Sequence, residues 1–568
     1  MKILFLTHAF NSLTQRLYVE LVRRGHEVSV EFDINDQVSM EAVALFEPDL
    51  IIAPFLKRAI PEAIWSRHCC MVVHPGIPGD RGPSALDWAI LGCETHWGVT
   101  VLQANGEMDG GDIWAAAEFP MREATKASLY RHEVAEAAVA AVREAVERFA
   151  GGAWQPQPPA QFPARRRGDW RPLMRQADRR IDWQSDSTAD VLRKIRSADG
   201  APGLLDHLFG HDCYLYDAHA APGLRGAPGT VLARSGPALC RATVDGAVWI
   251  GHLRDKAHAH PFKLPATLLL HEELAPLPEI AIDTADGYQE IRYKVIDGVG
   301  YLHFQFYNGA MSSEQCERLL RAYRAACRSD CRVLVLAGGS DYWSNGMHLN
   351  VIEAADSPSD ASWRNINAID DLAEAIITNE RQLTVAALRG NAGAGGVFLA
   401  RAADQVWARR GVVLNPHYKD MGNLYGSEYW SYLLPRYAGE DNARRISQAR
   451  LPMGVDEARE LGLVDEILDA DVRRFDAEVR AHAEGLALAD RFEPLRAQKI
   501  ARRRRDEAEK PLRLYRAQEL ERMRVNFYGF DSSYHVARYN FVYKVPKSRT
   551  PLTIAAHRRR GNARSLHE

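Results

Sequence analysis

His74 and Asp109 are residues whose types and positions suit proton transfer. His74 ends the apolar run CCMVVH and is followed by a loop rich in glycine and proline. About 35 residues later, the segment ANGEMDGGDIW presents Asp109 between Gly106 and Gly110. An imidazole titrates near neutral pH, so a histidine beside a carboxylate can accept a proton and return it. Either residue alone is typical of an ordinary strand end or a solvated turn, so the prediction depends on the pair.

Tyr418 and Glu428 form a second candidate pair, in the segment NPHYKDMGNLYGSEYW. Two glycine-rich segments precede them, LAGGSDYWSNGMHL at 336–349 and LRGNAGAGGVFLARAADQVWA at 388–408. Glycine allows a ligand to approach backbone N–H groups closely, although such segments also form simple tight turns. A phenol or a carboxylate can transfer a proton to a small acyl group; the alternatives are a packed aromatic ring and a solvated carboxylate at a helix cap.

The elements around His74 are those of an α/β sheet. The first 115 residues alternate apolar, β-branched runs with amphipathic segments, a pattern that predicts a parallel, doubly wound sheet. His74 then lies at the carboxyl end of a strand, where open α/β sheets bind ligands. The turn after the first strand, THAFNSLTQ, contains no glycine, which argues against NAD or FAD.

Composition narrows the class of protein. The chain has 568 residues, 46% of them hydrophobic and 26% charged, with a formal net charge of −3. This balance gives no electrostatic case for a nucleic-acid partner. The eight cysteines form no C-x-x-C pair and no zinc-type cluster, so we expect no metal site and a reduced, cytoplasmic environment. No apolar run reaches the length of about 18 residues that a membrane span needs.

Changes in composition divide the chain into three predicted domains. Proline, glycine and arginine are frequent over 151–170, as in a linker, and the following hundred residues carry one helix candidate and the short strands of a small β-barrel. A hairpin with Asp297 and Gly298 at its turn opens a further α/β unit, and the last hundred residues are mostly helical. The predicted domains are 1–160, 161–275 and 285–568.

The segment from His74 to Ile113 resembles the formyltransferases that use 10-formyltetrahydrofolate, particularly methionyl-tRNA formyltransferase. The resemblance covers about residues 1–270, including a β-barrel domain. It implies a catalytic trio of Asn, His and Asp at positions 72, 74 and 109, but position 72 is Val72, which has no side-chain donor for an oxyanion. The resemblance further implies that the following residues line the folate pocket: Ser84, Leu86, Asp87, Ile90, Gly106 and Gly110.

Residues 288–470 resemble the crotonase, or enoyl-CoA hydratase/isomerase, superfamily. The resemblance implies that coenzyme A binds here and that the backbone N–H groups of Met347 and Gly395 polarise a thioester carbonyl. The two glutamates of a hydratase correspond to Phe398 and about His417, so ordinary hydration is not expected. Tyr418 and Glu428 stand near the acid/base position, and the C-terminal Lys544 and Lys547 suit the phosphates of coenzyme A.

A formyltransferase-like half joined to a crotonase-like half resembles one family, HypX/HoxX, associated with maturation of [NiFe] hydrogenase. That resemblance implies synthesis of carbon monoxide: formyl transfer from folate to coenzyme A, then decarbonylation of formyl-CoA. Transient contact with other hydrogenase maturation proteins is also implied. Two alternatives stay open, a formyltransferase or formyl-folate hydrolase with another acceptor, and a scaffold that binds folate and coenzyme A without catalysis.

Overall fold

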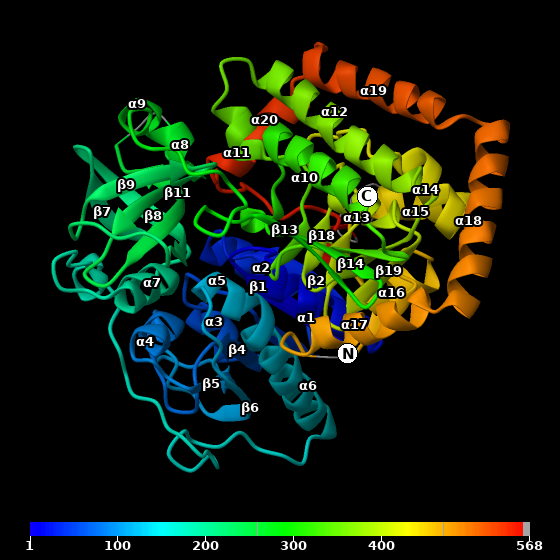
Figure 1. Ribbon diagram of the computed structural model, residues 1–568. Helices are drawn as coiled ribbons and strands as arrows, with labels where there is room; N and C mark the ends of the chain where they lie inside the picture. Colours follow the sequence, from blue (N-terminus) through cyan, green and yellow to red (C-terminus); the bar gives the residue numbers. More distant parts are fainter. Residues whose placement is uncertain (258–259, 470, 560–568) are drawn as a thin grey trace. The chain divides into compact units, whose positions relative to one another are not determined.

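The computed structural model describes residues 1–257, 260–469 and 471–559 (Figure 1). The chain folds into two compact units. The first unit contains residues 1–257, 265–278 and the C-terminal segment from Pro546, and the second contains residues 279–545 with a short piece ending at Leu264. The predicted α/β multidomain fold is confirmed: an α/β sheet domain and a small antiparallel β domain are followed by a second α/β domain with a helical C-terminus.

The first unit begins with a six-stranded sheet in the order β2-β1-β3-β4-β5-β6. Its strands are β1 (Lys2–Thr7), β2 (Glu27–Phe32), β3 (Leu50–Ala53), β4 (Cys70–His74), β5 (His96–Gln103) and β6 (Ile113–Pro120). The first four are parallel, as predicted, but β5 runs antiparallel to β4 and β6 antiparallel to β5. The loop between β5 and β6 is too short for the helical crossover that a parallel pair requires, so the chain turns back on itself.

Four helices of this sheet domain are α1 (Ser12–Arg23), α2 (Asp36–Phe46), α4 (Ala85–Leu91) and α6 (Ala135–Gly151). Asn11 and Asn35 are the N-cap residues of α1 and α2. Their side-chain oxygens accept hydrogen bonds from the backbone N–H groups of Thr14 and Val38, the third residue of each helix. Apolar side chains of β1 and β3 are fully buried with those of α2. This packing fixes the carboxyl ends of the strands, where β4 delivers His74.

The predicted small β-barrel domain follows in the first unit. Antiparallel strands lie in the order β7-β8-β11-β10-β9: β7 (Leu204–Leu208), β8 (His211–Ala220), β9 (Val231–Ser235), β10 (Ala238–Ala242) and β11 (Ala247–Asp255). Helix α7 (Thr188–Ser197) packs on β8 and starts with a capping box between Ser187 and Asp190. Its buried Val191, Leu192 and Ile195 join the core of this domain.

The C-terminal segment returns to the edge strand β2 of the first unit. The Ile554 carbonyl accepts a hydrogen bond from the Val30 amide at 2.9 Å. Fully buried Glu31 lies 2.9 Å from Nε2 of His557 and also accepts bonds from Thr550 and Arg558. Burial alone would raise the pKa of Glu31, but these bonds outweigh it and hold the pKa below its ordinary value of 4.5. The segment thus covers the outer side of β2, whose inner side pairs with β1.

The second unit is built on a six-stranded sheet in the order β13-β14-β15-β17-β19-β22. The strands are β13 (Ile291–Ile296), β14 (Val299–Phe304), β15 (Val333–Ala337), β17 (Leu383–Leu388), β19 (Gln405–Arg409) and β22 (Glu466–Leu468), parallel except for β13. The hairpin predicted at Asp297 and Gly298 joins β13 to β14, and both turn residues have positive φ. A small second sheet holds β16 (Tyr342–Ser344), β18 (Asn391–Gly393), β20 (Val413–Asn415) and β21 (Met453–Gly454).

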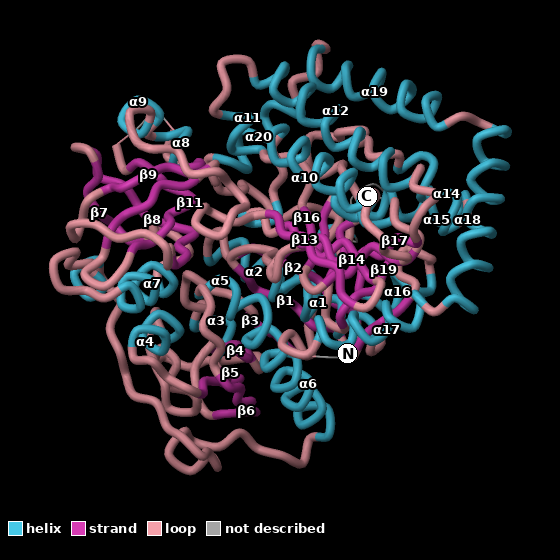
Figure 2. Tube along the Cα trace, viewed as in Figure 1, coloured by secondary structure: helices cyan, strands magenta, loops and turns pink. Residues whose placement is uncertain are grey.

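Helices make up most of the remaining second unit (Figure 2). α10 (Ser313–Ala326), α12 (Pro358–Ile377), α13 (Gly395–Arg401), α14 (Trp430–Ala438) and α15 (Glu440–Ala449) lie between the strands in sequence, and α17 (Phe475–Ala487), α18 (Ala489–Glu509), α19 (Leu512–Tyr528) and α20 (Ser533–Val542) follow them. α12 packs against α10, α13 and α19. Within the described residues no helix has the length and apolar character of a membrane span. All eight cysteines are free.

Candidate active sites

His74 lies between two carboxylates at the end of β4. Its Nε2 atom is 2.8 Å from Oδ2 of Asp80, and its Nδ1 atom is 3.6 Å from Oδ2 of Asp109. The imidazole is buried, as is the Asp80 carboxylate. The structure therefore brings together the predicted pair, His74 and Asp109, and adds a third residue to it.

Asp80 is the site residue that sequence reasoning missed. It lies six residues after His74 in the loop PGIPGD, and its Oδ1 atom is buried with no protein hydrogen-bond partner among the described residues. Two glycines make room for it: an added Cβ would lie 2.4 Å from Asp80 Oδ2 at Gly76 and 2.4 Å from Asp80 Cβ at Gly168. Because a single acidic residue in a loop is ordinarily solvated, its position in the sequence did not predict that it would bind His74.

The turn that carries Asp109 is fixed by its own backbone. Asp109 has a φ of 50°, in the left-handed region that aspartate tolerates better than most residues. Its Oδ2 atom also accepts a hydrogen bond from the Gly82 amide at 3.1 Å. Since Gly82 belongs to the loop after His74, this bond ties the two halves of the site together.

The predicted folate residues fall into two groups in the structure. Leu86 and Ile90 are buried on α4, and Ser84 accepts a hydrogen bond from the Met174 amide at 3.1 Å. The Asp87 carboxylate already pairs with Lys126 at 2.9 Å and Arg179 at 3.2 Å. The glycines belong to the Asp109 turn: Gly106 is exposed with open space beside it, and an added Cβ on Gly110 would meet the Glu107 carboxylate.

Val72 occupies the third position of the trio as a partly buried hydrophobic residue. It pairs with Leu102 across β4 and β5 and packs against the core formed by β1, β3 and α2. Its side chain offers no donor to an oxyanion. Any such donor at this site must come from His74 or from the backbone.

In the second unit, two glycine-rich loops bring the predicted amide donors close together. Gly346 has a φ of 74°, and a Cβ placed on it would lie 3.7 Å from the Gly395 nitrogen. Gly395 is the first residue of α13, and Met347 follows Gly346 beside Met311. Among the residues that the structure describes, neither the Met347 nor the Gly395 amide donates a hydrogen bond to the protein. Two free amides at one place can bind a carbonyl oxygen.

Glu428 lies directly against Gly395, one of these two amide donors. A Cβ added to Gly395 would fall 2.0 Å from Glu428 Oε1, so the carboxyl group fills the space that only glycine leaves open. Tyr418 donates a hydrogen bond to Glu428 Oε2 at 2.6 Å. Both residues are buried, and Glu428 is only 1% exposed. The structure thus unites all four predicted residues, Met347, Gly395, Tyr418 and Glu428.

The surroundings of Glu428 favour its neutral form. Burial raises its pKa to about 8, with a further contribution from the negative charge of Asp370, although the bond from Tyr418 acts in the opposite direction. Burial raises the pKa of Tyr418 well above its usual value of 10, and the negative charges of Glu428, Glu519 and Asp370 add to the effect. A carboxyl group with a pKa near neutrality can both take up and release a proton, whereas the phenol stays protonated.

The positions of the two hydratase glutamates are filled by groups of a different kind. Phe398 is buried on α13 and stacks on Tyr418, with ring centroids 5.5 Å apart. His417 is half-buried, and burial lowers the pKa of its imidazole. An apolar wall at Phe398 gives an attacking water no carboxylate to activate it.

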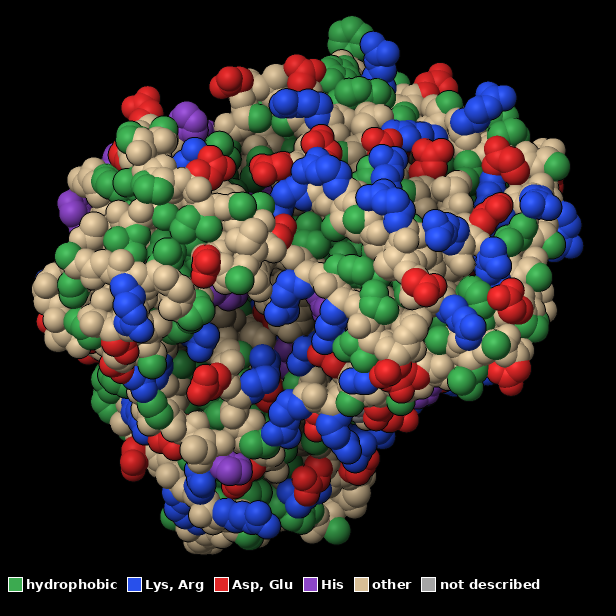
Figure 3. Space-filling view, viewed as in Figure 1, with side chains coloured by type: hydrophobic (Ala, Val, Ile, Leu, Met, Phe, Trp, Pro, Cys, Tyr) green, Lys and Arg blue, Asp and Glu red, His purple; other side chains and the backbone are tan. Residues whose placement is uncertain are grey.

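The two predicted coenzyme A lysines belong to different units. Lys544 is exposed near the end of the second unit, with its Nζ atom 4.2 Å from the centre of the Phe541 ring. Lys547 is exposed in the C-terminal segment of the first unit, with its Nζ atom 5.8 Å from the centre of the Phe32 ring. On the face drawn in Figure 3, basic and acidic side chains are interspersed.

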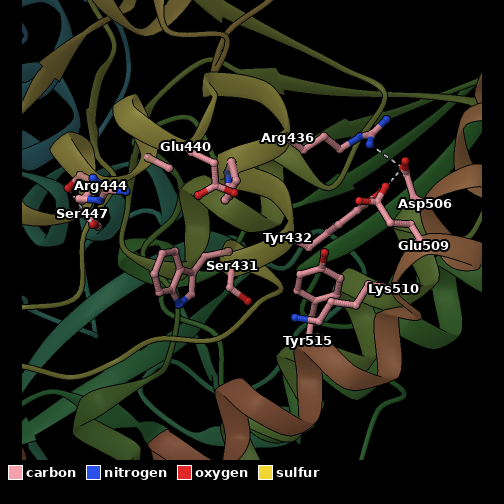
Figure 4. Close-up of a pocket in the computed structure, with 13 residues that line it drawn as sticks. Ser431, Tyr432, Arg436, Glu440, Arg444, Ser447, Asp506, Glu509, Lys510 and Tyr515 are labelled. Atoms are coloured by element: carbon pink, nitrogen blue, oxygen red, sulfur yellow. Dashed lines mark hydrogen bonds and ion pairs between the residues drawn. The ribbon is translucent and has the colours of Figure 1, made fainter.

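A cavity of about 580 Å³ lies elsewhere in the second unit, between α14, α15 and the start of α19 (Figure 4). Arg436 and Asp506 face each other across one side of it, 2.6 Å apart. None of the predicted catalytic residues lines this cavity. Trp430 and Ser431 form part of its wall, however, and they follow Glu428 closely in the chain.

Known protein families match all three parts of the chain. Residues 2–146 match the formyl transferase family, residues 173–261 the formyl transferase C-terminal domain, and residues 297–527 the enoyl-CoA hydratase/isomerase family. Methionyl-tRNA formyltransferase of Pelobacter propionicus is 27% identical over 218 residues, covering 38% of this chain and 66% of the relative. Fold and sites therefore define a protein that joins formyltransferase domains to an enoyl-CoA hydratase/isomerase-like domain.

Two relatives match over nearly the whole length. Hydrogenase maturation factor HoxX of Bradyrhizobium diazoefficiens is 60% identical over 558 residues, which cover 98% of this chain and 97% of the relative. The crystal structure of HypX from Aquifex aeolicus in complex with tetrahydrofolic acid has 47% sequence identity and a TM-score of 0.94, covering 98% of this chain and 99% of that one. The chain belongs to the HoxX/HypX family of hydrogenase maturation factors.

Proposed function

We propose that this protein makes carbon monoxide from 10-formyltetrahydrofolate for the iron centre of [NiFe] hydrogenase. The observation that carries the proposal is the position of Glu428, a buried carboxyl group with a near-neutral pKa placed against two free amides. Such a group can remove a proton from an acyl carbon whose oxygen the amides hold. The formyl site of the first unit supplies the acyl group, and coenzyme A carries it as a thioester.

The first reaction moves the formyl group from the folate nitrogen to the thiol of coenzyme A. A carbon–sulfur bond forms, the carbon–nitrogen bond breaks, and the thiol proton ends on the folate nitrogen. His74 accepts and returns this proton at Nδ1, the atom that faces Asp109, while Asp80 accepts a hydrogen bond from Nε2 and so fixes the tautomer. The buried, unpartnered Oδ1 of Asp80 offers a further polar contact, and so the residues present fit a polar ligand such as the pterin.

We assign the remaining folate contacts to the residues around this site. Ser84, Leu86 and Ile90 form one wall, and Gly106 and Gly110 bring the backbone of the Asp109 turn close to the ligand. Asp87 acts by fixing α4 through its pairs with Lys126 and Arg179. Lys544 and Lys547 are proposed phosphate contacts for coenzyme A.

The second reaction decomposes formyl-CoA into carbon monoxide and coenzyme A. The Met347 and Gly395 amides hold the thioester oxygen while the formyl hydrogen leaves as a proton to Glu428 and the carbon–sulfur bond breaks. The thiolate then recovers a proton, and coenzyme A is regenerated. Tyr418 donates to Glu428 Oε2 and so directs the other oxygen, Oε1, toward Gly395. Phe398 keeps water away from the acyl group, which disfavours hydrolysis to formate.

The family assignment supports a place in hydrogenase maturation. Carbon monoxide is a small neutral gas, and delivery to an iron centre suits transient contact with other maturation proteins in the cytoplasm. A formyltransferase or hydrolase with another acceptor stays an alternative, and Val72 disfavours it because ordinary formyl transfer uses an amide donor there. The other alternative is a scaffold that binds folate and coenzyme A without catalysis. Such a scaffold gives no role to a buried Glu428 whose pKa is about 8.

The test uses the full chain with 10-formyltetrahydrofolate labelled at the formyl carbon and with coenzyme A. We expect labelled carbon monoxide from the wild type and none from His74→Ala, which should still bind tetrahydrofolate. Glu428→Gln should accumulate labelled formyl-CoA without gas. Labelled formate as the sole product would refute the proposal in favour of a hydrolase, and unchanged function of His74→Ala in maturation would favour a scaffold.

A further inference from the structure

We infer that Asp370 and Glu519 are positioning residues for Glu428, holding its turn in place from α12 and α19. The inference rests on the proposed role of Glu428 in decarbonylation. Neither residue belongs to the sequence segments that predicted the site, and neither touches the space beside Gly395. Asp370 acts on Glu428 through its backbone amide and through charge, and Glu519 acts through the backbone amides of Tyr429 and Ser431.

The turn that carries Glu428 needs outside support. Glu428 and Tyr429 both have a φ of 59°, so two successive residues with side chains adopt the left-handed conformation. L-residues other than glycine seldom take this conformation, and a pair of them persists only where surrounding contacts hold the backbone. The turn also interrupts the chain just before α14 begins at Trp430.

Asp370 supplies the first of these contacts. It is fully buried on α12, and its Oδ1 atom accepts a hydrogen bond from the Glu428 amide at 2.8 Å. Its Oδ2 atom accepts a second bond from the Ser427 hydroxyl at 2.7 Å. One carboxylate therefore fixes Ser427, which precedes the left-handed pair, and Glu428, its first member.

Glu519 supplies the second contact, from α19. Its Oε2 atom accepts a hydrogen bond from the Tyr429 amide at 3.0 Å, and its Oε1 atom accepts one from the Ser431 amide at 2.8 Å. The Ser431 hydroxyl also donates to it, and the Ser427 hydroxyl, which donates to Asp370, lies 3.3 Å from Oε2. Ser431 also lines the cavity shown in Figure 4.

The charges around Glu428 are unusual for a protein interior. Asp370 faces it from α12, Glu519 from α19, the Tyr418 phenol from its own loop, and the Cys316 thiol from α10. The nearby cation is Arg516, whose Nε atom is 3.9 Å from Asp370 Oδ2.

Arg516 also pairs with Asp371 at 2.7 Å and Glu374 at 3.1 Å, so it is shared among several carboxylates. Burial raises the pKa of Asp370 to about 6 and that of Glu519 to about 8. Asp370 is thus the member of the cluster that ionises first, and its charge keeps Glu428 protonated to higher pH.

Asp370→Asn separates positioning from plain structural support. The amide oxygen of asparagine can still accept from the Glu428 amide, and its NH₂ group can donate to the Ser427 hydroxyl, which can turn toward Glu519 at 3.3 Å. The bonds are thus kept while the charge is removed. The matched control is Asp371→Asn, which removes the next carboxylate on α12. Asp371 pairs with the same Arg516, but its side chain is half-exposed.

The assay supplies formyl-CoA directly and measures carbon monoxide release against pH, so the first unit takes no part. For Asp370→Asn we expect the acid limb of the pH profile to shift down by about one unit, a tenfold rise at pH 6 relative to the plateau. Asp371→Asn should not shift it. A second variant, Glu519→Gln, tests the backbone contacts: Glu519 has a pKa of about 8 and is uncharged over the acid limb, so we expect a lower rate with an unshifted limb. The exposed Glu521→Gln is its control.

An unshifted pH profile in Asp370→Asn, or an unchanged rate in Glu519→Gln, would overturn the inference. Infrared difference spectra against Glu428→Gln report the protonation of Glu428 without turnover. If wild type releases no carbon monoxide at any pH, the proposed function fails, and a lowered Glu428 titration in the spectra of Asp370→Asn still supports the positioning role. An unchanged titration would overturn it.

Discussion

Replacing Gly395 with alanine would place a methyl carbon where the Glu428 carboxyl group now lies. The added Cβ would be 2.0 Å from Oε1, 2.4 Å from Cδ and 2.8 Å from Oε2 of Glu428. A carbon and an oxygen that are not bonded need about 3.0 to 3.5 Å, so the carboxyl group must retreat by about 1 Å or more. Gly395 lies in the first turn of α13, where alanine is the better helix former, so the backbone itself tolerates the change.

The expected loss is about 100-fold in the rate of carbon monoxide release. Displacing a reacting group by about 1 Å commonly costs a factor of this size, equivalent to about 2.7 kcal/mol in the barrier. The retreat must also stretch the 2.6 Å bond from Tyr418, because the buried carboxyl has little room to move. The assay is labelled carbon monoxide from labelled formyl-CoA, with coenzyme A binding and thermal unfolding measured on the same sample.

The matched control is Gly393→Ala, two residues earlier at the end of β18. Its Cβ would meet only Asn345 Oδ1, at 3.1 Å, and a side-chain oxygen can give by a few tenths of an ångström. We expect this variant to stay within about threefold of the wild type. A folded Gly395→Ala protein that also stays within threefold would refute the reasoning, because the carboxyl position against Gly395 would then have no bearing on the reaction.

Two further predictions concern the first unit. Asp80→Asn should slow formyl transfer at least ~10-fold in a single-turnover assay, because an amide can donate to His74 Nε2 and so favour the wrong tautomer; an unchanged rate would remove Asp80 from the site. His557→Ala should lower the free energy of unfolding by about 3 kcal/mol in urea, since it leaves Glu31 buried without one partner, while the exposed Arg559→Ala should not. The lowered pKa of Glu31 means that its stabilising contribution is present above pH 4.5 and is lost as the pH falls through that lowered value; a wild-type stability that rises on acidification there would contradict this.

Local pattern was sufficient for much of the fold. Alternation of apolar runs predicted the strands around His74, and the Asp297-Gly298 turn predicted the hairpin of the second unit, because a left-handed turn depends on the residues that form it. The parallel direction predicted for β5 and β6 was wrong. Strand direction depends on how the connecting segment crosses the sheet, and apolar alternation is the same for both directions.

Each candidate site likewise contains residues that the sequence predicted and residues that only the structure showed. His74, Asp109, Met347, Gly395, Tyr418 and Glu428 could be named from segments with glycine, an acid/base group and a strand end close together. Asp80 could not, because a single acidic residue in a loop is ordinarily solvated. Nor could Asp370 and Glu519, which lie on long helices 58 and 90 residues from the backbone groups that they bind.

The sequence by itself determined the kinds of chemistry available to this protein: an imidazole with a carboxylate in one half, and a phenol with a carboxyl group behind glycine-rich loops in the other. Only the tertiary structure decided how those groups are tuned. Burial and the approach of residues distant in the chain set the pKa of Glu428, and a Cβ-sized space at Gly395 sets its position. Such effects depend on distances between elements and on the exclusion of water, which no short stretch of sequence specifies.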